Sequence, residues 1–419
     1  MTALEKKIVS LSQKAKLAAP LVAKLSTATK NKILNSLADT LLVRASEIKK
    51  VNQKDVVAAQ KKKLAPAMID RLTLTDKTIQ SMSQGLKEVA ALNDPVGEVT
   101  KAWTRPNGLQ IQKVRIPLGV IGIVYESRPN VTIDAAGLCL KSGNAVVLRG
   151  GSEAIHSNVL LGKIIREVLK KNNVNPDIIQ ILDTPDRKAM EILVKQTRFI
   201  DLIIPRGGES LMKWMAEHSR IPVIKHDKGV CHVFVDEDAN TKMAEDICIN
   251  GKVQRPGVCN ALETVLVHEK IASRFLPHMI ERFAEAGVEV RGDAKVKSVD
   301  KRVKKATAAD WDMEYLDLII AMKVVPSLEE AITHIQKHGS LHTESIITEN
   351  PAHAEEFLNR LDSSMVAWNA STRFNDGGQL GLGAEIGIST TKMHAFGPMG
   401  LEELTTTKYV VKGTGQVRI

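Results

Sequence analysis

The stretch Val120-Ile-Gly-Ile-Val-Tyr125 decides the fold, because an apolar run of this length is typical of a short strand buried inside a sheet. Three more runs follow at residues 145–148, 178–182 and 202–204, and they alternate with helical stretches such as 154–171. Short buried strands separated by amphipathic helices require right-handed crossovers. The alternation therefore predicts a parallel sheet covered by helices on both faces.

The alternation continues towards the C-terminus and predicts a second sheet. Apolar runs lie at residues 233–235, 264–267, 318–325, 345–348 and 365–368, and the predicted helices between them include 271–286, 328–338 and 352–361. The first ninety or so residues have helical spacing, an Asn107-Gly108 pair between two alternating runs predicts a hairpin, and residues 404–411 are β-rich. We therefore predict an α/β protein with two Rossmann-like parallel-sheet lobes and a small β element.

Composition limits the classes of function. The chain has 419 residues, of which 43% are hydrophobic and 25% charged, so it can bury a core. Its 58 basic and 48 acidic residues leave a net charge of +10, but the densest basic run is only Lys61-Lys62-Lys63, and aromatic residues make up 3%. This pattern does not favour nucleic acid, for which basic patches and stacking aromatics are expected. Small anionic molecules fit the charge better, and a non-catalytic basic binding protein is the alternative from another class.

The cysteines and the N-terminus bear on the compartment. The four cysteines include no CxxC pair, which is typical of free thiols in a reducing compartment. The apolar region of a signal peptide does not follow Lys6 and Lys7, so no signal peptide is predicted. No run approaches the ~18 apolar residues of a membrane span. We expect a cytoplasmic protein that does not contact a membrane.

Two glycine-rich junctions follow predicted strands, Arg149-Gly150-Gly151-Ser152-Glu153 and Pro205-Arg206-Gly207-Gly208-Glu209. Ligands bind at strand-to-helix junctions of parallel sheets, where backbone N–H groups face anions. An arginine beside paired glycines suits a phosphate group, although a Gly-Gly pair is also an ordinary turn.

Cys259 is a candidate nucleophile, since it follows a Pro256-Gly257 turn and Arg255 would favour its thiolate, although most lone cysteines are small buried residues of a core. The other three cysteines, Cys139, Cys231 and Cys248, lie in apolar contexts and are predicted to be core residues. His334 and His338 are spaced for a metal, but the glutamate of an HExxH motif is missing. We predict no metal site, and expect this helix end to line a substrate cleft.

Nearly the whole chain resembles the gamma-glutamyl phosphate reductases, a branch of the aldehyde dehydrogenase superfamily. The resemblance rests on motifs in the same order: residues 120–130, 148–154, 204–208, Gln254-Arg-Pro-Gly-Val-Cys-Asn260, 331–344, 369–374 and 397–401. It implies an aldehyde dehydrogenase-like fold, with a cofactor-binding domain at 1–253 and a catalytic domain at 254–400. It also implies oligomerisation strands at 97–115 and 401–419, and hence a homodimer or tetramer.

The resemblance implies NADPH-dependent reduction of L-glutamyl 5-phosphate to L-glutamate 5-semialdehyde and phosphate, in L-proline biosynthesis, through a thioester on Cys259. Asn260, next to Cys259, is the second candidate catalytic residue. The candidate substrate-binding residues are Ser127, Arg128, Asn130, Arg255 and His342. A hydrolytic or CoA-linked semialdehyde dehydrogenase of the same fold is the alternative. The glutamate base of hydrolytic relatives is absent, since the equivalent stretch begins at His226. Glutamate 5-kinase, which would pass on its labile product, is the candidate protein partner.

The resemblance also implies the cofactor. NAD-using relatives carry a glutamate three residues after the basic residue that ends the strand, and here Arg149 is followed by Ser152 at that place. A small neutral residue beside an arginine leaves room for a 2′-phosphate, which favours NADP. Glu314 resembles the glutamate that holds the nicotinamide ribose. The full set of candidate cofactor-binding residues is Arg149, Gly150, Gly151, Ser152, Pro205, Arg206, Gly207, Gly208 and Glu314.

Overall fold

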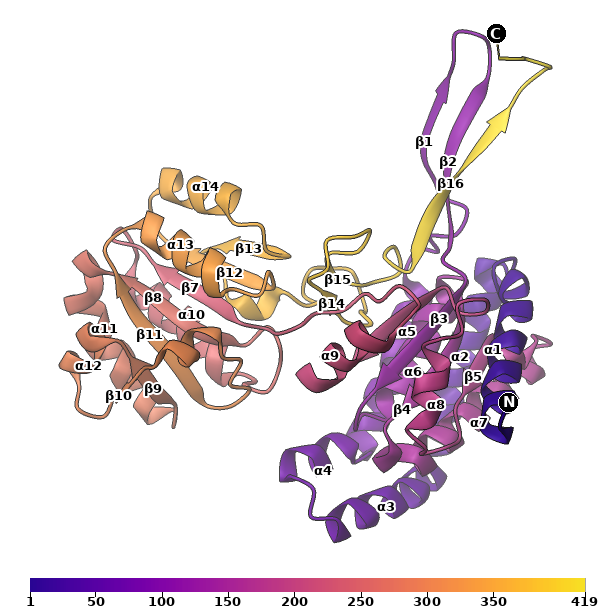
Figure 1. Cartoon of the computed structure of the whole chain (residues 1–419), viewed down its shortest axis with the longest axis horizontal. Helices are drawn as coiled ribbons and strands as arrows, with labels where there is room; N and C mark the ends of the chain where they lie inside the picture. The colour runs from indigo at the N-terminus through magenta and orange to yellow at the C-terminus, as the bar shows by residue number, and fades with distance from the viewer. Residues whose placement is uncertain (419) are drawn as a thin grey trace.

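The computed structural model describes residues 1–418, so the last residue of the predicted segment 401–419 lies outside the described residues. Two lobes lie side by side, and a narrow β element projects from one of them (Figure 1). None of the described helices is long and apolar enough to cross a bilayer.

The first lobe is built on a four-stranded parallel sheet in the order β5-β4-β3-β6. Its strands are β3 (Val120–Tyr125), β4 (Ala145–Gly150), β5 (Ile179–Ile181) and β6 (Leu202–Arg206). These are the four runs from which the sheet was predicted, and β3 and β4 are buried along their whole length.

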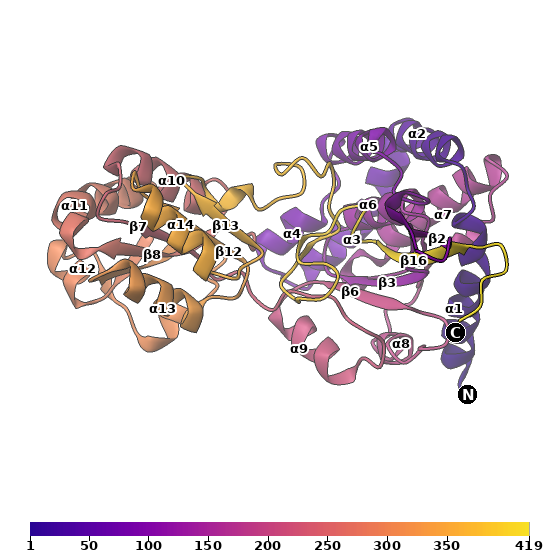
Figure 2. The same ribbon diagram turned by 90° about the horizontal axis from the view of Figure 1, so that it is seen from above.

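Helices cover this sheet and make most of the first lobe (Figures 1 and 2). They are α1 (Ala3–Val22), α2 (Thr27–Val43), α3 (Ala45–Lys61), α4 (Pro66–Leu72), α5 (Asp76–Ala91), α6 (Asn130–Lys141), α7 (Ile155–Lys171), α8 (Lys188–Leu193) and α9 (Glu209–His218). Buried side chains of α1, α2, α5, α6 and α7 join those of the strands in one core. The helical prediction for the first ninety residues is confirmed.

The second lobe is a seven-stranded parallel sheet in the order β10-β9-β11-β8-β7-β12-β13. Its strands are β7 (Cys231–Val235), β8 (Leu262–His268), β9 (Glu289–Gly292), β10 (Lys304–Lys305), β11 (Ile319–Val325), β12 (Thr343–Ile347) and β13 (Met365–Trp368). Its helices are α10 (Thr241–Val253), α11 (Glu269–Glu285), α12 (Ala294–Val299), α13 (Leu328–His338) and α14 (Pro351–Arg360). The prediction of two parallel-sheet lobes is confirmed.

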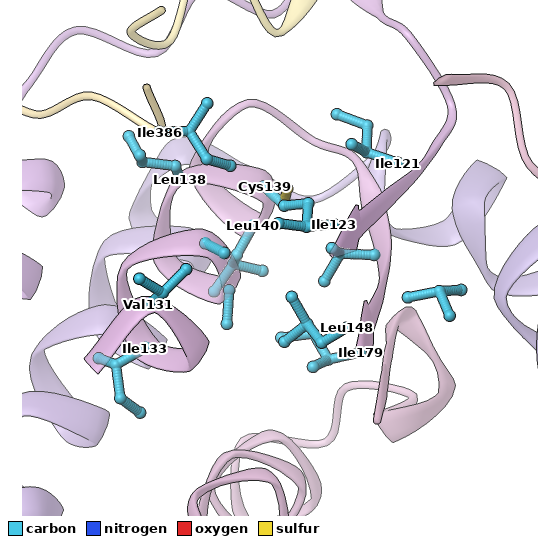
Figure 3. Close-up of a cluster of buried hydrophobic side chains, with 14 of the residues drawn as sticks. Ile121, Ile123, Val131, Ile133, Leu138, Cys139, Leu140, Leu148, Ile179 and Ile386 are labelled. Carbon is cyan, nitrogen blue, oxygen red and sulfur yellow. The ribbon is translucent and has the colours of Figure 1, made fainter. Parts of the chain in front are cut away.

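The boundary between the lobes lies earlier than predicted. Strand β7 pairs with β8 and β12, so it and α10 belong to the second lobe, and a division after residue 253 would cut that lobe in two. The chain also returns: Ile386, Met399 and Leu404 are buried in the core of the first lobe. Figure 3 shows Ile386 beside Leu138 of α6. The predicted range 254–400 therefore ends on the first lobe.

The projecting element is an antiparallel sheet in the order β1-β2-β16, formed by β1 (Val99–Thr104), β2 (Gln110–Pro117) and β16 (Thr405–Lys412). Register places Trp103, Ile111 and Val411 in one row across the three strands. The Trp103 and Tyr409 rings pack edge to face, with their centroids 6.2 Å apart. One face of this sheet therefore carries a cluster of exposed apolar side chains among basic ones, and it projects away from both cores (Figure 1).

Candidate active site

A cleft of about 400 Å³ lies where the two lobes meet. The first lobe contributes the ends of β3 and β6 and residues of the α4 region, and the second contributes the turn before β8 and the loop at 314–316. The linking segments add His226, Asp227 and residues between 373 and 388. Segments from the whole length of the chain thus converge on one site.

Cys259 lies in this cleft, in the turn between α10 and β8, and is the one partly exposed cysteine in the described chain. Burial raises the pKa of its thiol to about 11, with Arg206 lowering it and the charges of Glu314 and Glu385 raising it. A Cβ at Gly229 would lie 1.9 Å from the Cys259 carbonyl oxygen, so the close approach of these two backbone segments requires glycine at position 229. The predicted nucleophile is therefore placed for contact with a small molecule.

The other cysteines are core residues, as predicted. Cys139, Cys231 and Cys248 are fully buried, and burial raises the pKa of each thiol. The Cys231 thiol donates to the Cys259 carbonyl oxygen at 3.2 Å, so it supports the nucleophile's turn from behind.

Asn260 also lines the cleft, but its side chain is engaged. Its Nδ2 donates to the Asn375 carbonyl oxygen at 2.9 Å, while its own carbonyl oxygen accepts from Thr372 Oγ1 at 2.8 Å. Its buried Oδ1 has no partner among the described residues. In this structure Asn260 fastens the 372–375 turn beside Cys259.

The segment after β3 supplies Ser127 and Arg128. Ser127 is in the left-handed region (φ 35°), and its N–H and Oγ both donate to Glu153 Oε1, at 2.6 and 2.7 Å. Burial, with the charges of Arg206, Arg71 and Arg255, lowers the pKa of Arg128 to about 10. Asn130 does not line the cleft; as the first residue of α6 it donates to Asp134 at 3.0 Å.

Arginines are numerous in the cleft, although six carboxylates line it as well. The five arginines are Arg71, Arg128, Arg206, Arg255 and Arg373. Arg71 comes from α4 and donates to the Gly257 carbonyl oxygen at 3.2 Å, next to the nucleophile's turn. No motif in the sequence pointed to Arg71, and Arg373 lay in a quoted motif without a role. Five guanidinium groups around one cleft are suited to a ligand with several negative charges.

The two glycine-rich junctions differ in position. Arg206, Gly207 and Gly208 line the cleft, whereas Pro205 lies within β6. The chain runs from β3 to β4 and β5 on one side and then returns to β6 on the other, so β3 and β6 flank a topological switch point. Ligands bind at such points in parallel sheets. This crevice is the candidate cofactor site.

The other junction lies one strand away, at the end of β4. Arg149, Gly150, Gly151 and Ser152 do not line the cleft around Cys259. Arg149 is buried, and its Nε has no hydrogen-bond partner within residues 1–418. An unpartnered buried guanidinium at the carboxyl edge of the sheet fits a phosphate group of an extended dinucleotide.

Glu314 and His226 also line the cleft around Cys259. Burial raises the pKa of Glu314, and it lies close enough to Cys259 for its charge to be felt there. Burial and Arg206 lower the pKa of His226 to about 4, so its ring is neutral at neutral pH. His226 occupies the cleft where the sequence had suggested that a glutamate base is missing.

Three other histidines were predicted to lie closer to the substrate than the structure places them. His342 is fully buried, and its Nδ1 lies 2.7 Å from Thr343 Oγ1, so it does not reach the cleft. The ring centroids of His334 and His338 lie 4.6 Å apart with the rings tilted by 40°, and His338 pairs with Asp312 instead of lining the site. The helix end on α13 is thus part of the second lobe's packing, and its expected place beside substrate is wrong.

A family model described as "Aldehyde dehydrogenase family" matches residues 2–302. Gamma-glutamyl phosphate reductases from Thermodesulfovibrio yellowstonii and Geotalea daltonii are each 55% identical to the chain, over 98% and 100% of both proteins respectively. The chain belongs to the aldehyde dehydrogenase family, in its gamma-glutamyl phosphate reductase branch. The resemblance predicted from the sequence motifs is confirmed.

Solved structures agree with this membership. The crystal structure of gamma-glutamyl phosphate reductase from Thermotoga maritima has a TM-score of 0.96 and 46% identity, covering 98% of this chain and 100% of that one. An engineered glycolyl-CoA reductase with bound NADP+ has the same fold, with a TM-score of 0.69 at 15% identity over 97% of this chain and 96% of that one. A nicotinamide cofactor fits both the family and the crevice between β3 and β6.

Proposed function

We propose that this protein reduces L-glutamyl 5-phosphate to L-glutamate 5-semialdehyde with NADPH and releases phosphate, as a step in L-proline biosynthesis. The observation that carries the proposal is a partly exposed cysteine in a cleft lined by five arginines, within a chain 55% identical to proteins named for this reaction. An acyl phosphate requires both features, since a nucleophile must attack its carbonyl carbon while its phosphate charge is neutralised.

The first half of the reaction forms a thioester. The Cys259 sulfur bonds to the acyl carbon, the bond from that carbon to the phosphate oxygen breaks, and phosphate leaves with the electron pair. The thiol first loses its proton to solvent, because the thiolate is the reactive form. Arg206, whose charge lowers the pKa of Cys259, favours that form. The other arginines offset the phosphate charge in the cleft.

The second half is a reduction. NADPH, when bound, supplies the hydride that converts the thioester to a thiohemiacetal. That adduct then collapses: the carbon–sulfur bond breaks, the aldehyde is released and the sulfur regains a proton. We assign the oxyanion in both halves to the backbone N–H of Cys259, because the Asn260 amide already donates to Asn375.

The cleft also disfavours hydrolysis of the thioester. In hydrolytic relatives a glutamate base stands at the position of His226, and a carboxylate there would activate water and waste the intermediate as glutamate. His226 is present instead, and its pKa of about 4 makes it a weak base. We therefore prefer phosphate as the exchanging group over water or CoA.

We propose NADPH over NADH because Arg149 has an unpartnered Nε and Ser152, three residues on, is small and exposed. A carboxylate at residue 152 would repel a 2′-phosphate, whereas serine leaves space beside the guanidinium.

The reverse reaction tests the proposal. We expect the protein with L-glutamate 5-semialdehyde, phosphate and NADP to form NADPH, and expect omission of phosphate to stop it. Cys259→Ser should lower the rate on the order of 10³-fold or more, since the nucleophile is lost. Turnover that does not need phosphate would instead establish the hydrolytic or CoA-linked reaction.

We also propose that the β1-β2-β16 sheet joins a second copy of the chain. Tyr409 and Val411 are exposed on the face that also carries Trp103, and β1 and β16 are both open edges. Exposed apolar side chains beside unpaired strand edges are an association hazard unless a partner covers them. A homodimer or tetramer would cover them.

A further inference from the structure

We infer that Glu385 binds the α-ammonium group of the substrate and thereby gives the enzyme its preference for an amino acid over the matching acid without the amine. The inference rests on the proposed function, because it takes the substrate to be a glutamyl derivative. Two methylene groups separate the α-carbon of that substrate from the carbon that Cys259 attacks. A carboxylate of the cleft that lies near the nucleophile is therefore needed to pair with the ammonium group.

Glu385 is placed for this contact. It lies on the segment that returns to the first lobe, one residue before Ile386 in the core, so its backbone is held firmly. Its Oε2 accepts from the Gly377 N–H at 2.9 Å. Within residues 1–418, no other hydrogen bond and no ion pair is recorded for this carboxylate, which lines the cleft. Oε1 is thus available to a ligand.

The other acidic residues of the cleft also have partners, although Glu126 and Asp376 each keep one carboxylate oxygen free among the described residues. Glu126 accepts from the Gly208 N–H at 3.1 Å, and Glu209 pairs with Lys228 at 3.6 Å. Asp227 pairs with Lys225, and Asp376 Oδ1 accepts from two backbone N–H groups of its own loop, at 3.0 and 3.1 Å.

Glu314 is assigned to the cofactor by the resemblance. Of the other carboxylates that keep a free oxygen, Glu385 is the one whose charge acts on Cys259, so it is the candidate for a cationic group of the substrate.

The electrostatics agree with an occupant of positive charge. The charge of Glu385 acts on Cys259, so the two groups face the same part of the cleft. Burial raises the pKa of Glu385 and the charge of Arg206 acts in the opposite direction, but within residues 1–418 the carboxylate makes no ion pair. A bound ammonium group would supply a cation to pair with it and would be held by a charge-assisted hydrogen bond.

A comparison of two aldehydes tests the inference. L-Glutamate 5-semialdehyde and 5-oxopentanoate have the same chain, but the second lacks the amine. In the reverse assay with phosphate and NADP, we expect the wild type to prefer the first in kcat/KM. Glu385→Gln should lower kcat/KM for the semialdehyde by about 10- to 100-fold, the value of one charged hydrogen bond, and leave that for 5-oxopentanoate within about twofold.

Two further variants make the result specific. Glu385→Asp keeps the charge and should retain part of the preference. Asp376→Asn, a neighbour in the same cleft wall, should leave the ratio of the two kcat/KM values unchanged. If Glu385→Gln lowers both substrates equally, or leaves the ratio as in the wild type, the carboxylate is structural and the inference is wrong. A wild type that forms NADPH with neither aldehyde would refute the proposed function itself.

Discussion

Lys252 and Glu263 form an ion pair of 2.7 Å in which both side chains are fully buried. The second oxygen of Glu263 accepts from the Leu316 N–H at 3.3 Å, two residues after Glu314. Leu316 itself has a left-handed backbone (φ 54°), so the loop depends on this contact to hold an unfavourable conformation. The pair therefore supports the loop that carries the candidate cofactor-binding glutamate.

Lys252→Met should destabilise the protein by about 3–5 kcal/mol, because it leaves Glu263 buried without a counter-charge. Urea unfolding followed by circular dichroism measures the change. The double variant Lys252→Met with Glu263→Leu should recover most of the loss, since neither charge is then buried. A single variant as stable as the wild type would show that Glu263 is not charged there.

Alkylation of Cys259 by iodoacetamide should rise steadily between pH 7 and pH 10, because the pKa of its thiol is raised to about 11 and only the thiolate reacts. Arg206→Gln removes a charge that lowers this pKa, so alkylation at a given pH should slow roughly 3- to 10-fold. Glu314→Gln removes a charge that raises it and should speed the reaction.

Mass spectrometry of the labelled peptides gives these rates. Cys139, Cys231 and Cys248 serve as internal controls, since all three are buried and should stay unlabelled in the folded protein. Equal rates in the two charge variants would contradict the placement of Arg206 and Glu314 beside the sulfur.

Ser152→Glu should weaken NADPH binding about tenfold relative to NADH, because a carboxylate at this position would meet the 2′-phosphate. The two dissociation constants, measured by fluorescence titration, give the ratio. Ser152→Gln is the matched control of similar size without charge. An unchanged ratio would place the adenosine end of the cofactor elsewhere.

Val411→Asp should separate the oligomer into single chains, since it places a charge in the apolar row that Val411 forms with Trp103 and Ile111 on the β1-β2-β16 sheet. Light scattering after size exclusion measures the mass. Lys408→Ala, on the opposite face of the same strand, should leave the assembly intact. A wild type that already runs as a monomer would contradict the proposed interface.

Local patterns in the sequence were sufficient to predict most of the fold. Apolar runs such as 120–125 located the strands, because burial on both faces requires uninterrupted apolar residues. The division into lobes was missed at β7, since a run of apolar residues does not reveal which sheet it joins. Its pairing with β8 and β12 depends on contacts between segments that are distant in the chain.

The residues of the site also fall into two groups, those that a local motif predicted and those that only the folded chain brings together. Cys259 was recognised from a turn motif, which is local. Arg71 and Glu385 were missed, because each lies far along the chain from Cys259 and only folding brings them to one cleft. His342 was wrongly assigned to substrate because a histidine near a motif gives no sign of its burial, and the structure encloses it completely.

The return of the chain to the first lobe has a consequence for synthesis on the ribosome. Ile386, Ala395, Met399, Leu401 and Leu404 complete a core whose other members were made hundreds of residues earlier. The second lobe is continuous in the chain and is translated in between, so it is free to fold while the first still waits for its last segment. A nascent chain released before this segment emerges would expose apolar surface on the older half, and would become a target for chaperones.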